Sequence, residues 1–290
     1  MAGEKKKPEM ITIAVVAKLK GETKPLKRVF WAYKRIVNEM IRYAWPRKLK
    51  NHIAIREALY EEMKEKYPWL PVNYIYTASQ HASMICKSFA EILKMVKEGK
   101  IKAEIKKEMP EFKGGSVLLH PSSFSVDLES WRASISTPAG RMRYGLLHGR
   151  HHEEVVKAAG WKVGQSWIVR RRREFFLAIS LKKPAKYMEY NGRAMAIDVN
   201  ENNVTVLSPS GFYQFITKER AIRTAYFLKR RKIQELKISE REKRKLMKKY
   251  EGRERERIRN VYHNVVNEIL SIAERDRVTA IAMENLKGIR

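Results

Sequence analysis

The sequence predicts an α+β protein of two domains, in which a small β-barrel interrupted by a helical insertion is followed by a second domain with its own sheet. Three observations support this prediction. The 290 residues correspond to about two domains of ordinary size. A β-branched, apolar segment at residues 10–20 is followed by three helical patterns rather than by a βαβ repeat. Residues 101–190 then contain short apolar segments separated by Gly, Pro and Ser, which is typical of a small barrel.

The first domain is expected to place its first strand within residues 1–22 and to complete the barrel with residues 101–185. A helical lobe is expected between them, at residues 23–100, because apolar residues recur there every three or four positions. The helical stretches cover residues 24–46, 51–66 and 73–98. The later barrel strands are expected at residues 116–119, 123–128, 132–136, 167–169 and 175–181.

The second domain is expected at residues 192–290, after a linker at residues 182–190. Its first strands are predicted at residues 194–199, 204–207 and 212–216, joined by turns that contain Asn and Gly. A long helical stretch follows from residue 218 to residue 274, and we expect it to break near Gly252. A last strand is predicted at residues 278–283.

The charge of the chain indicates a polyanionic partner. The sequence has 61 Lys and Arg against 32 Asp and Glu, a formal net charge of +29. Such a surplus repels itself, so nucleic acid is the first candidate partner. No membrane partner is expected, because the apolar run at residues 11–17 is too short to span a bilayer and residues 1–10 lack the apolar core of a signal peptide.

Cys86 is the only cysteine, which excludes an internal disulfide and any complete Cys–Cys zinc site within this chain. We therefore expect a cytoplasmic protein. The chain has three Asp and four Gln, and Glu, Lys and Arg are abundant. This bias is typical of thermophile proteins.

Three groups of basic residues are candidate nucleic-acid contacts. Four consecutive arginines are expected to cross a hairpin between two strands, where phosphate contacts are their best explanation; they are Arg170, Arg171, Arg172 and Arg173. A second group lies on the long helical stretch, where ion pairs on a solvated helix are the alternative; it contains Lys229, Arg230, Arg231 and Lys232. The third group is expected in a loop, with a metal site as the alternative; it contains Arg141, Arg143 and Arg150 together with His148, His151 and His152.

Two carboxylates stand at the ends of apolar strands. Asp198 lies in the segment 194–199, where a buried carboxylate would be costly unless a cation compensated it. Glu284 follows the predicted strand 278–283. If the two strands are neighbours, the pair would suit Mg²⁺, which prefers oxygen ligands. The alternatives are a turn-initiating Asp and an ordinary polar residue at a strand end.

Three segments follow one another in the second half of the chain: AIDVNENNVTVLSPSG, RERIRNVYHNVVNEIL and VTAIAMENLKGIR. Their order resembles the TnpB family, the OrfB-type, transposon-encoded, RNA-guided DNA endonucleases related to type V CRISPR effectors. Asp198 and Glu284 match the first catalytic Asp and the catalytic Glu of that family. The Arg-x-apolar-x-His element of the intervening helix is matched by Arg259, Val261 and His263. Residues 110–113 and 137–141 resemble recurring segments of the family's barrel, so the resemblance spans essentially the whole chain.

The resemblance implies a specific architecture and activity. The first domain would be a wedge or OB-like barrel that holds guide RNA, with the helical lobe serving in recognition of target double-stranded DNA. The second domain would be a partial RNase H-like (RuvC) α/β domain. Asp198 and Glu284 would be metal ligands for Mg²⁺-dependent phosphodiester hydrolysis at a two-metal site, and Arg259 would contact nucleic acid.

The chain departs from the family pattern in two places. Asn200 replaces a common Gly, a mild change because Asn tolerates the left-handed conformation. The family continues past the Glu into a zinc-binding Cys-x-x-Cys pair and a third catalytic Asp, and neither follows Glu284 before residue 290. We therefore expect little or no cleavage by this chain alone, and an open apolar strand edge at 278–283 through which copies could associate.

Three explanations of the missing segment stay open: a truncated protein, a natural remnant, or a piece completed in trans. Two alternative functions also stay open. One is a non-catalytic, RNA-guided DNA-binding protein of a repressor-like kind, and the other is a general RNA-binding protein.

Overall fold

The computed structural model describes residues 9–101, 108–157, 160–185 and 189–284. The chain is a mixed α and β protein that divides into two units, Met1–Ala185 and Lys186–Arg290. Each unit has its own sheet. The prediction of a mixed α+β chain is confirmed.

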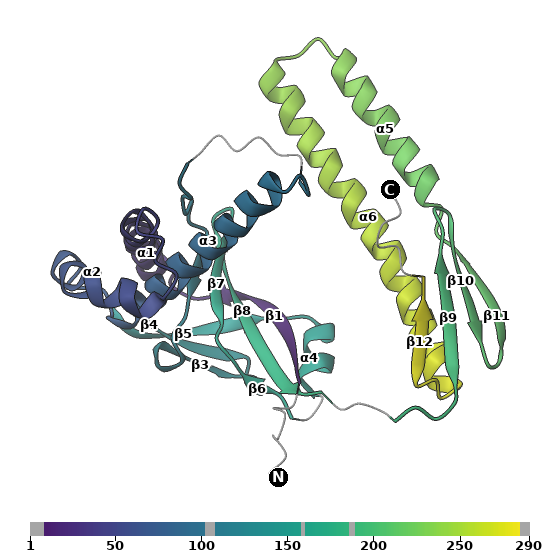
Figure 1. Ribbon diagram of the computed structural model, residues 1–290, viewed down its shortest axis with the longest axis horizontal. Helices are drawn as coiled ribbons and strands as arrows, with labels where there is room; N and C mark the ends of the chain where they lie inside the picture. The colour runs from purple at the N-terminus through teal and green to yellow at the C-terminus, as the bar shows by residue number, and fades with distance from the viewer. Residues whose placement is uncertain (1–8, 102–107, 158–159, 186–188, 285–290) are drawn as a thin grey trace. The chain divides into compact units, whose positions relative to one another are not determined.

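The first unit is built on an antiparallel sheet that curls into a half-barrel (Figure 1). Its strands are β1 (Met10–Lys20), β2 (Ser116–Leu118), β3 (Phe124–Asp127), β4 (Arg132–Thr137), β5 (Gly140–Leu147), β6 (Lys162–Val163), β7 (Trp167–Arg171) and β8 (Glu174–Pro184). The strand order is β2-β7-β8-β1-β5-β4-β3, with β6 paired to β8. β1 lies in the middle of this order. The strands that follow it in sequence therefore pair on both of its sides.

Three helices occupy the interruption between β1 and β2. They are α1 (Lys24–Ala44), α2 (His52–Lys66) and α3 (Asn73–Lys97). Pro25 stands in the first turn of α1, and the Asn51 side chain caps α2 by accepting a 2.9 Å hydrogen bond from the Ile53 amide. The predicted helical insertion in a β domain is confirmed.

The helices and the sheet share one apolar core. Phe30 of α1 meets Phe175 of β8 edge to face, with ring centroids 5.1 Å apart. The buried Tyr33 hydroxyl donates to the Thr77 carbonyl of α3 at 3.1 Å, and burial raises the pKa of this tyrosine. The helical insertion is therefore packed as part of the first unit.

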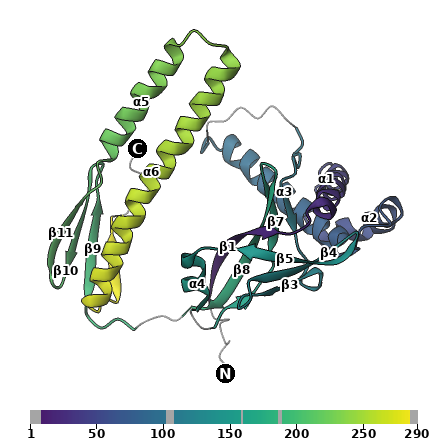
Figure 2. The ribbon, with the colours of Figure 1, turned by 180° about the vertical axis from the view of Figure 1, so that it is seen from behind.

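The second unit has a four-stranded sheet in the order β11-β10-β9-β12. The strands are β9 (Ala194–Val199), β10 (Asn203–Ser208), β11 (Gly211–Ile216) and β12 (Ala280–Met283). The first three are antiparallel, whereas β12 runs parallel to β9. Helix α5 (Glu219–Glu235) and the longer α6 (Glu240–Arg275) separate β11 from β12 and form a helical hairpin (Figure 1 and Figure 2).

The C-terminal half of α6 covers one face of this sheet. Its Val265, Ile269 and Ile272 pack with Met195 of β9 and Val206 of β10 in a separate apolar cluster. Within the described residues, β12 is the edge strand on one side, and its Ile281 and Met283 side chains are exposed. The predicted apolar edge is therefore present in this part of the chain.

The break in the long helical stretch lies at residues 236–239, and the prediction of a break near Gly252 is wrong. Ser239 begins α6 with a capping box, in which its hydroxyl and the Glu242 side chain each bond the other's backbone amide. Gly252 lies inside α6. A single exposed Gly costs a helix only about 1 kcal/mol, so a long helix tolerates it.

Several elements of the first unit were not predicted, namely β5, β6, helix α4 (Arg150–Lys157) and a short 3-10 helix at Pro121–Ser123. Inward-facing Met142, Tyr144 and Leu146 do alternate along β5. Arg and Gly between them obscure the apolar signal, and the strand is stabilised instead by its neighbours β4 and β1.

Candidate carboxylate pair and nucleic-acid interface

The strands that carry the two candidate carboxylates are neighbours. The parallel register pairs Met283 of β12 with Ile197 of β9. Asp198 and Glu284 each follow one residue later, so the two carboxylates stand at the same end of adjacent strands. This is the arrangement on which the predicted magnesium site depended.

Asp198 is exposed, so the prediction of a buried carboxylate is wrong. Side chains alternate along β9, and Met195 and Ile197 face the side that α6 covers. Asp198 faces the other side, opposite Thr205 of β10. The cost of burying a charge therefore does not apply, and the carboxylate is open to solvent or to a hydrated cation.

Asn200 holds one oxygen of Asp198. Its side-chain amide donates a 2.7 Å hydrogen bond to Asp198 Oδ2, and the same amide lies 3.4 Å from Asn203 Oδ1. Glu284 is also exposed. The described residues contain no group of three or more His, Cys, Asp or Glu side chains arranged to hold a metal ion. The donor set at this edge is thus two carboxylates, with oxygen ligands of the type that Mg²⁺ accepts.

The four consecutive arginines cross a hairpin, as predicted. Arg170 and Arg171 end β7, and Arg172 and Arg173 form the turn before β8. Arg172 adopts a positive φ of 59°. All four side chains are exposed. Glu174, the acidic residue that follows the turn in sequence, is bonded to Lys18 at 2.5 Å, so the turn presents concentrated positive charge to solvent.

The third basic group is not a loop, which corrects the prediction. Arg141 and Arg143 lie on the exposed face of β5, opposite Ser136 and Ser134 of β4, and Arg150 begins α4. Arg141 Nε donates to Ser134 Oγ at 3.0 Å. Arg150 pairs with Glu154 one turn later, at 3.1 Å.

The histidines of this group hold the start of α4 in place. The His148 ring stacks on Trp131 with centroids 3.9 Å apart, and its Nε2 lies 3.0 Å from Glu153 Oε1. His148 Nδ1 lies 3.0 Å from the Leu146 carbonyl, and His152 Nδ1 accepts from the Gly149 amide at 3.1 Å. These contacts occupy both ring nitrogens of His148 and Nδ1 of His152, which favours a structural role for these two histidines over the alternative of a metal site.

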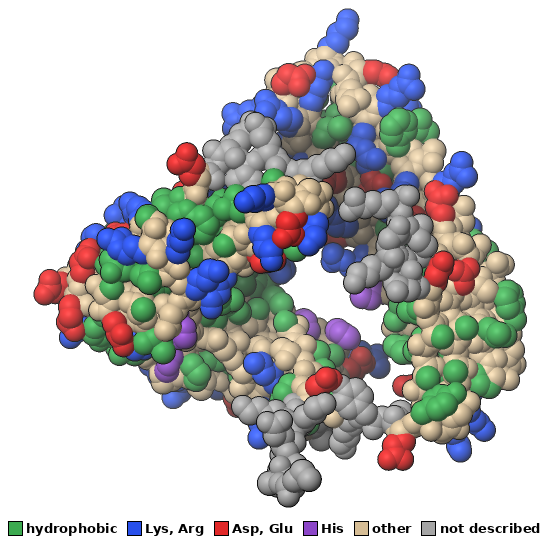
Figure 3. All heavy atoms as spheres, viewed as in Figure 1, with side chains coloured by type: hydrophobic (Ala, Val, Ile, Leu, Met, Phe, Trp, Pro, Cys, Tyr) green, Lys and Arg blue, Asp and Glu red, His purple; other side chains and the backbone are tan. Residues whose placement is uncertain are grey.

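The basic residues of α5 are partly balanced by acids. Arg230 forms an ion pair with Glu254 of α6, and Arg231 lies 3.6 Å from Glu235. Lys229 lies over the Tyr226 ring at 4.9 Å, and Lys232 is exposed. Figure 3 shows Lys and Arg side chains interspersed with Asp and Glu along the hairpin. Ion pairs therefore account for Arg230 and Arg231, and the phosphate contacts expected of this helix stay a prediction.

The Arg-x-apolar-x-His element lies on α6. Arg259 and His263 are exposed, whereas Val261 is half-buried. The neighbouring Tyr262 hydroxyl donates to Glu219 of α5 at 2.5 Å. This bond and the Arg223 guanidinium lower the pKa of the Glu219 carboxyl. The element therefore lies where the two helices are joined.

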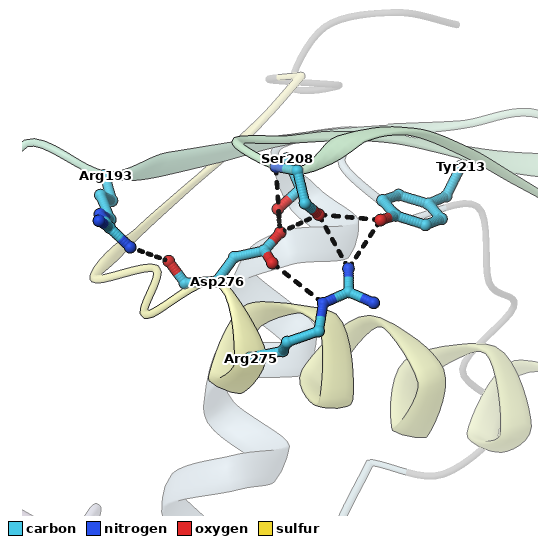
Figure 4. A network of polar contacts seen from close by, with 6 residues as sticks. Arg193, Ser208, Tyr213, Arg275 and Asp276 are labelled. Carbon is cyan, nitrogen blue, oxygen red and sulfur yellow. Dashed lines mark hydrogen bonds and ion pairs between the residues drawn. The ribbon is translucent and has the colours of Figure 1, made fainter.

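Asp276 forms a polar network that the sequence analysis missed (Figure 4). This residue ends α6, and its buried carboxylate accepts bonds from the hydroxyls of Ser208, at the end of β10, and Ser210, in the β10–β11 turn. Arg275 Nε donates to the same carboxylate at 3.1 Å and its Nη2 donates to Tyr213 Oη at 2.7 Å. The serine hydroxyls and then Arg275 hold the pKa of the Asp276 carboxyl well below its usual range. The one hint of this network in the sequence was that Asp276 belongs to a residue type that is rare in this chain.

Replacing Asp276 with Asn should loosen the β10–β11 turn. The carboxylate has a lowered pKa in the folded state, so its contribution to stability is present above the ordinary carboxyl pKa of 3.8 and is lost as the pH falls below it. At pH 7 we expect amide hydrogen exchange in β10 and β11 to accelerate by about tenfold, because the serine and arginine donors lose a charged acceptor. Asp127→Asn, in a turn of the first unit, is the control and should leave these amides unchanged. Equal exchange in the two variants would contradict the assigned role.

No helix in the described part of the chain combines the length and the apolar character that a membrane span requires.

The comparisons with known proteins give one informative match. No described protein family matches the chain. An uncharacterized protein of Methanocaldococcus jannaschii, MJ0857, is 30% identical over 214 residues, which cover 67% of this chain and 76% of the relative. The chain belongs to the same family as MJ0857. The name of this relative assigns no activity.

Proposed function

We propose that the chain is a TnpB-like protein that binds a guide RNA and a matching DNA duplex, with Asp198 and Glu284 as the Mg²⁺ ligands of a RuvC-like, RNase H-type domain. The observation that carries the proposal is the parallel pairing of β12 with β9, which brings Asp198 and Glu284 to the same end of adjacent strands. The resemblance to that family requires the two carboxylates to lie on adjacent strands. The apolar pattern of the two strands alone does not imply that they pair.

Two further features support nucleic-acid binding. The net charge of +29 favours a polyanion. The exposed arginine turn at residues 170–173 sits on the half-barrel, where the resemblance would place guide RNA. By the same resemblance, the half-barrel would be the wedge or OB-like barrel and α1–α3 the recognition lobe.

A Mg²⁺ ion held by these oxygens would activate a water molecule and stabilise the leaving oxygen of a phosphodiester. The chain's own part is to fix the two carboxylates on neighbouring strands and to orient Asp198 through the Asn200 amide. Because the described residues bring two carboxylates together rather than three, we expect guide-dependent DNA binding with little or no cleavage.

The second candidate function is RNA-guided DNA binding without catalysis. The hydrogen bond from Asn200 to Asp198 favours it, because the amide occupies an oxygen that a metal ion would otherwise use. The two candidates share their nucleic-acid partners and differ only in the chemistry at this edge of the sheet.

The test uses the full chain expressed with its flanking genomic DNA, so that an associated RNA can be copurified and sequenced. Duplexes that match or do not match this RNA are then assayed for binding and for cleavage in Mg²⁺, with wild type and Asp198→Asn. We expect matched duplexes to bind at least tenfold more tightly than unmatched ones, and the variant to bind equally well.

Each other outcome has a defined meaning. Equal affinity for unrelated RNAs with no dependence on DNA sequence would overturn the proposal in favour of general RNA binding. Cleavage of matched DNA that Asp198→Asn abolishes would support the carboxylate assignment and overturn the expectation of an inactive chain. Cleavage that survives Asp198→Asn would overturn the assignment of the site.

A further inference from the structure

The exposed side of helix α1 carries basic residues and a single aromatic ring. The spacing of its exposed residues places them on one side of the helix; they are Lys24, Lys27, Arg28, Trp31, Lys34, Arg35 and Arg42. Arg42 lines a pocket together with Glu108 and Glu111. We call the other six residues the α1 stripe, and none of them is acidic. The α1 stripe therefore presents five positive charges around one indole.

The positive charge of the α1 stripe opposes the stability of the helix itself. Lys24 and Lys27 stand in the first turn, which contains no acidic residue, and the preceding Thr23 makes no capping hydrogen bond through its side chain. A cation at a helix N-terminus interacts unfavourably with the helix dipole, and like charges three or four residues apart repel each other. Local helix stability therefore does not account for the stripe, whereas a polyanion bound along it would compensate these charges.

Two arginines of the stripe lie over aromatic rings. The Arg35 guanidinium carbon is 4.1 Å from the centre of the Trp31 ring, and the Arg28 guanidinium carbon is 4.6 Å from the centre of the Trp69 ring. A guanidinium stacked on a ring keeps the N–H groups at its edge free for a phosphate. These contacts hold the two guanidinium groups in place without neutralising them.

The acidic residues closest to the stripe in sequence lie at its two ends. Glu22 is exposed and precedes the helix. Glu39, one turn after Arg35, binds Lys66 of α2, whose Nζ lies 2.9 Å from both of its carboxylate oxygens. None of the ion pairs between described residues involves a cation of the stripe. The charge of the α1 stripe is therefore available to a partner.

Trp31 is unusual because it is exposed. Along α1, all of which lies within the described residues, it is the only large apolar side chain that is exposed, at 51%. The apolar side of the helix, which includes Leu26 and Phe30, is buried in the core of the first unit. Trp31 meets Tyr67 edge to face at 6.2 Å. The half-exposed indole and the Arg35 guanidinium over it are planar surfaces on which an unpaired base can stack.

We propose that the α1 stripe binds an unpaired stretch of a nucleic-acid strand, with phosphates on its Lys and Arg side chains and one base stacked on the Trp31–Arg35 pair. The inference rests on the proposed function in taking nucleic acid as the partner. It adds a single-stranded site on the helical insertion, where the resemblance implies contact with duplex DNA. Within a paired duplex the bases stack on one another, so an unpaired stretch is what offers a base face to the indole.

Two other partners of a basic helix fit the stripe less well. A helix that lies on an anionic membrane inserts its apolar side, but the apolar side of α1 is already packed in the core. The centre of a protein interface usually contains several apolar side chains, and the stripe has Trp31 alone. A chain of phosphates with exposed bases matches both the charge and the single ring.

The contribution of the ring is tested with Trp31→Leu, which removes the planar surface, and with Trp31→Phe, which keeps one. Phe212→Leu is the control, because it removes an exposed ring from β11 of the second unit. The full chain, freed of RNA in high salt, is titrated with single-stranded RNA, single-stranded DNA, an abasic strand of the same length and a paired duplex. Urea unfolding of each variant checks that the fold is retained.

We expect wild type to bind the base-bearing single strands about tenfold more tightly than the abasic strand. Trp31→Leu should lose this preference without weakening the binding of the abasic strand, whereas Trp31→Phe and Phe212→Leu should keep it. The affinity for the paired duplex should be the same in all four proteins. A Trp31 effect with either RNA or DNA supports the proposal, and the larger effect identifies the source of the strand.

The contribution of the charges is tested separately with the double variant Lys27→Gln, Lys34→Gln. Each phosphate contact to a single strand contributes about 0.7 to the slope of log K against log salt concentration, so we expect the slope to decrease by about 1.4. The control, Lys87→Gln, Lys97→Gln, removes two exposed charges from α3 and should keep the wild-type slope.

The proposal is overturned if Trp31→Leu weakens base-bearing and abasic strands equally, if the two lysine variants change the slope equally, or if duplex binding depends on Trp31 to the same extent. Each of these results leaves guide-dependent duplex binding, and with it the proposed function, in place. Binding to phosphatidylserine vesicles that depends on Trp31, without such dependence for the strands, would also overturn it. Failure of wild type to bind any strand or a guide-matched duplex would contradict the proposed function as well.

Discussion

Between pH 6.5 and pH 4, the free energy of unfolding of the first unit is expected to fall by about 3 kcal/mol because of His81 alone. Burial lowers the pKa of this histidine from 6.5 to about 4. In this window His81 is protonated in the unfolded chain and neutral in the folded chain. The free energy of unfolding therefore rises with pH and decreases as the pH falls. At pH 7 the ring is mostly neutral in both states and the effect is small.

Tryptophan fluorescence during urea unfolding measures this effect in the full chain. All six tryptophans lie within Met1–Ala185, so the signal reports the first unit. The carboxylates Glu219 and Asp276, whose pKa values are lowered, lie in the second unit, so their loss at acid pH does not enter this signal.

His81→Leu should remove most of the acid sensitivity between pH 6.5 and pH 4. It should also leave stability at pH 7 unchanged or higher, because an apolar side chain replaces a ring whose buried Nδ1 has no hydrogen-bond partner among the described residues. His151→Leu, on the exposed surface of α4, is the matched control and should keep the wild-type slope. A slope that persists in His81→Leu would assign the acid sensitivity to other groups.

The second large effect is expected at the arginine turn between β7 and β8. The double variant Arg172→Gly, Arg173→Ser removes two exposed charges while keeping the turn, because Gly readily takes the positive φ of 59° found at residue 172. Each phosphate contact to a single strand contributes about 0.7 to the slope of log K against log salt concentration. Loss of two contacts should lower that slope by about 1.4 and weaken binding of single-stranded RNA roughly 25-fold at 0.1 M salt.

The matched control removes two charges that already have protein partners. Lys64 and Lys94 are exposed on helices of the same unit, and each lies within 4 Å of a glutamate, Glu61 or Glu98. Lys64→Ser, Lys94→Ser has the same net charge as the arginine variant. A binding titration over several salt concentrations compares the two. Equal changes in slope would mean that overall charge, rather than contact at the turn, governs the affinity.

The sequence predicted most elements of both units from local patterns. Apolar residues at intervals of three and four mark α1, α2 and α3, and β-branched runs mark β1 and β9. These signals are local because a helix or strand that packs on one side must repeat its apolar residues with its own period. The arginine turn was predictable for the same reason, since two apolar strands flank it.

The candidate site was predictable in part. Asp198 and Glu284 were identified from their strand ends and from the resemblance of those segments to a known family. Their adjacency was expected only from that resemblance and not from local patterns, because the parallel pairing of β12 with β9 joins strands separated by two helices. The sequence of neither strand indicates which strand it pairs with.

The sequence by itself determined the helical insertion, the basic character and the identity of the two carboxylates. Only the tertiary structure decided which of the polar groups are buried. Asp198 sits in an apolar strand and is exposed, because α6 covers the other face of its sheet. His81 and Asp276 sit in ordinary helical sequence and are buried, one beneath aromatic rings and the other beneath a hairpin turn. Burial depends on which residues from elsewhere in the chain pack against a side chain. The residues next to it in sequence do not indicate what those packing partners are.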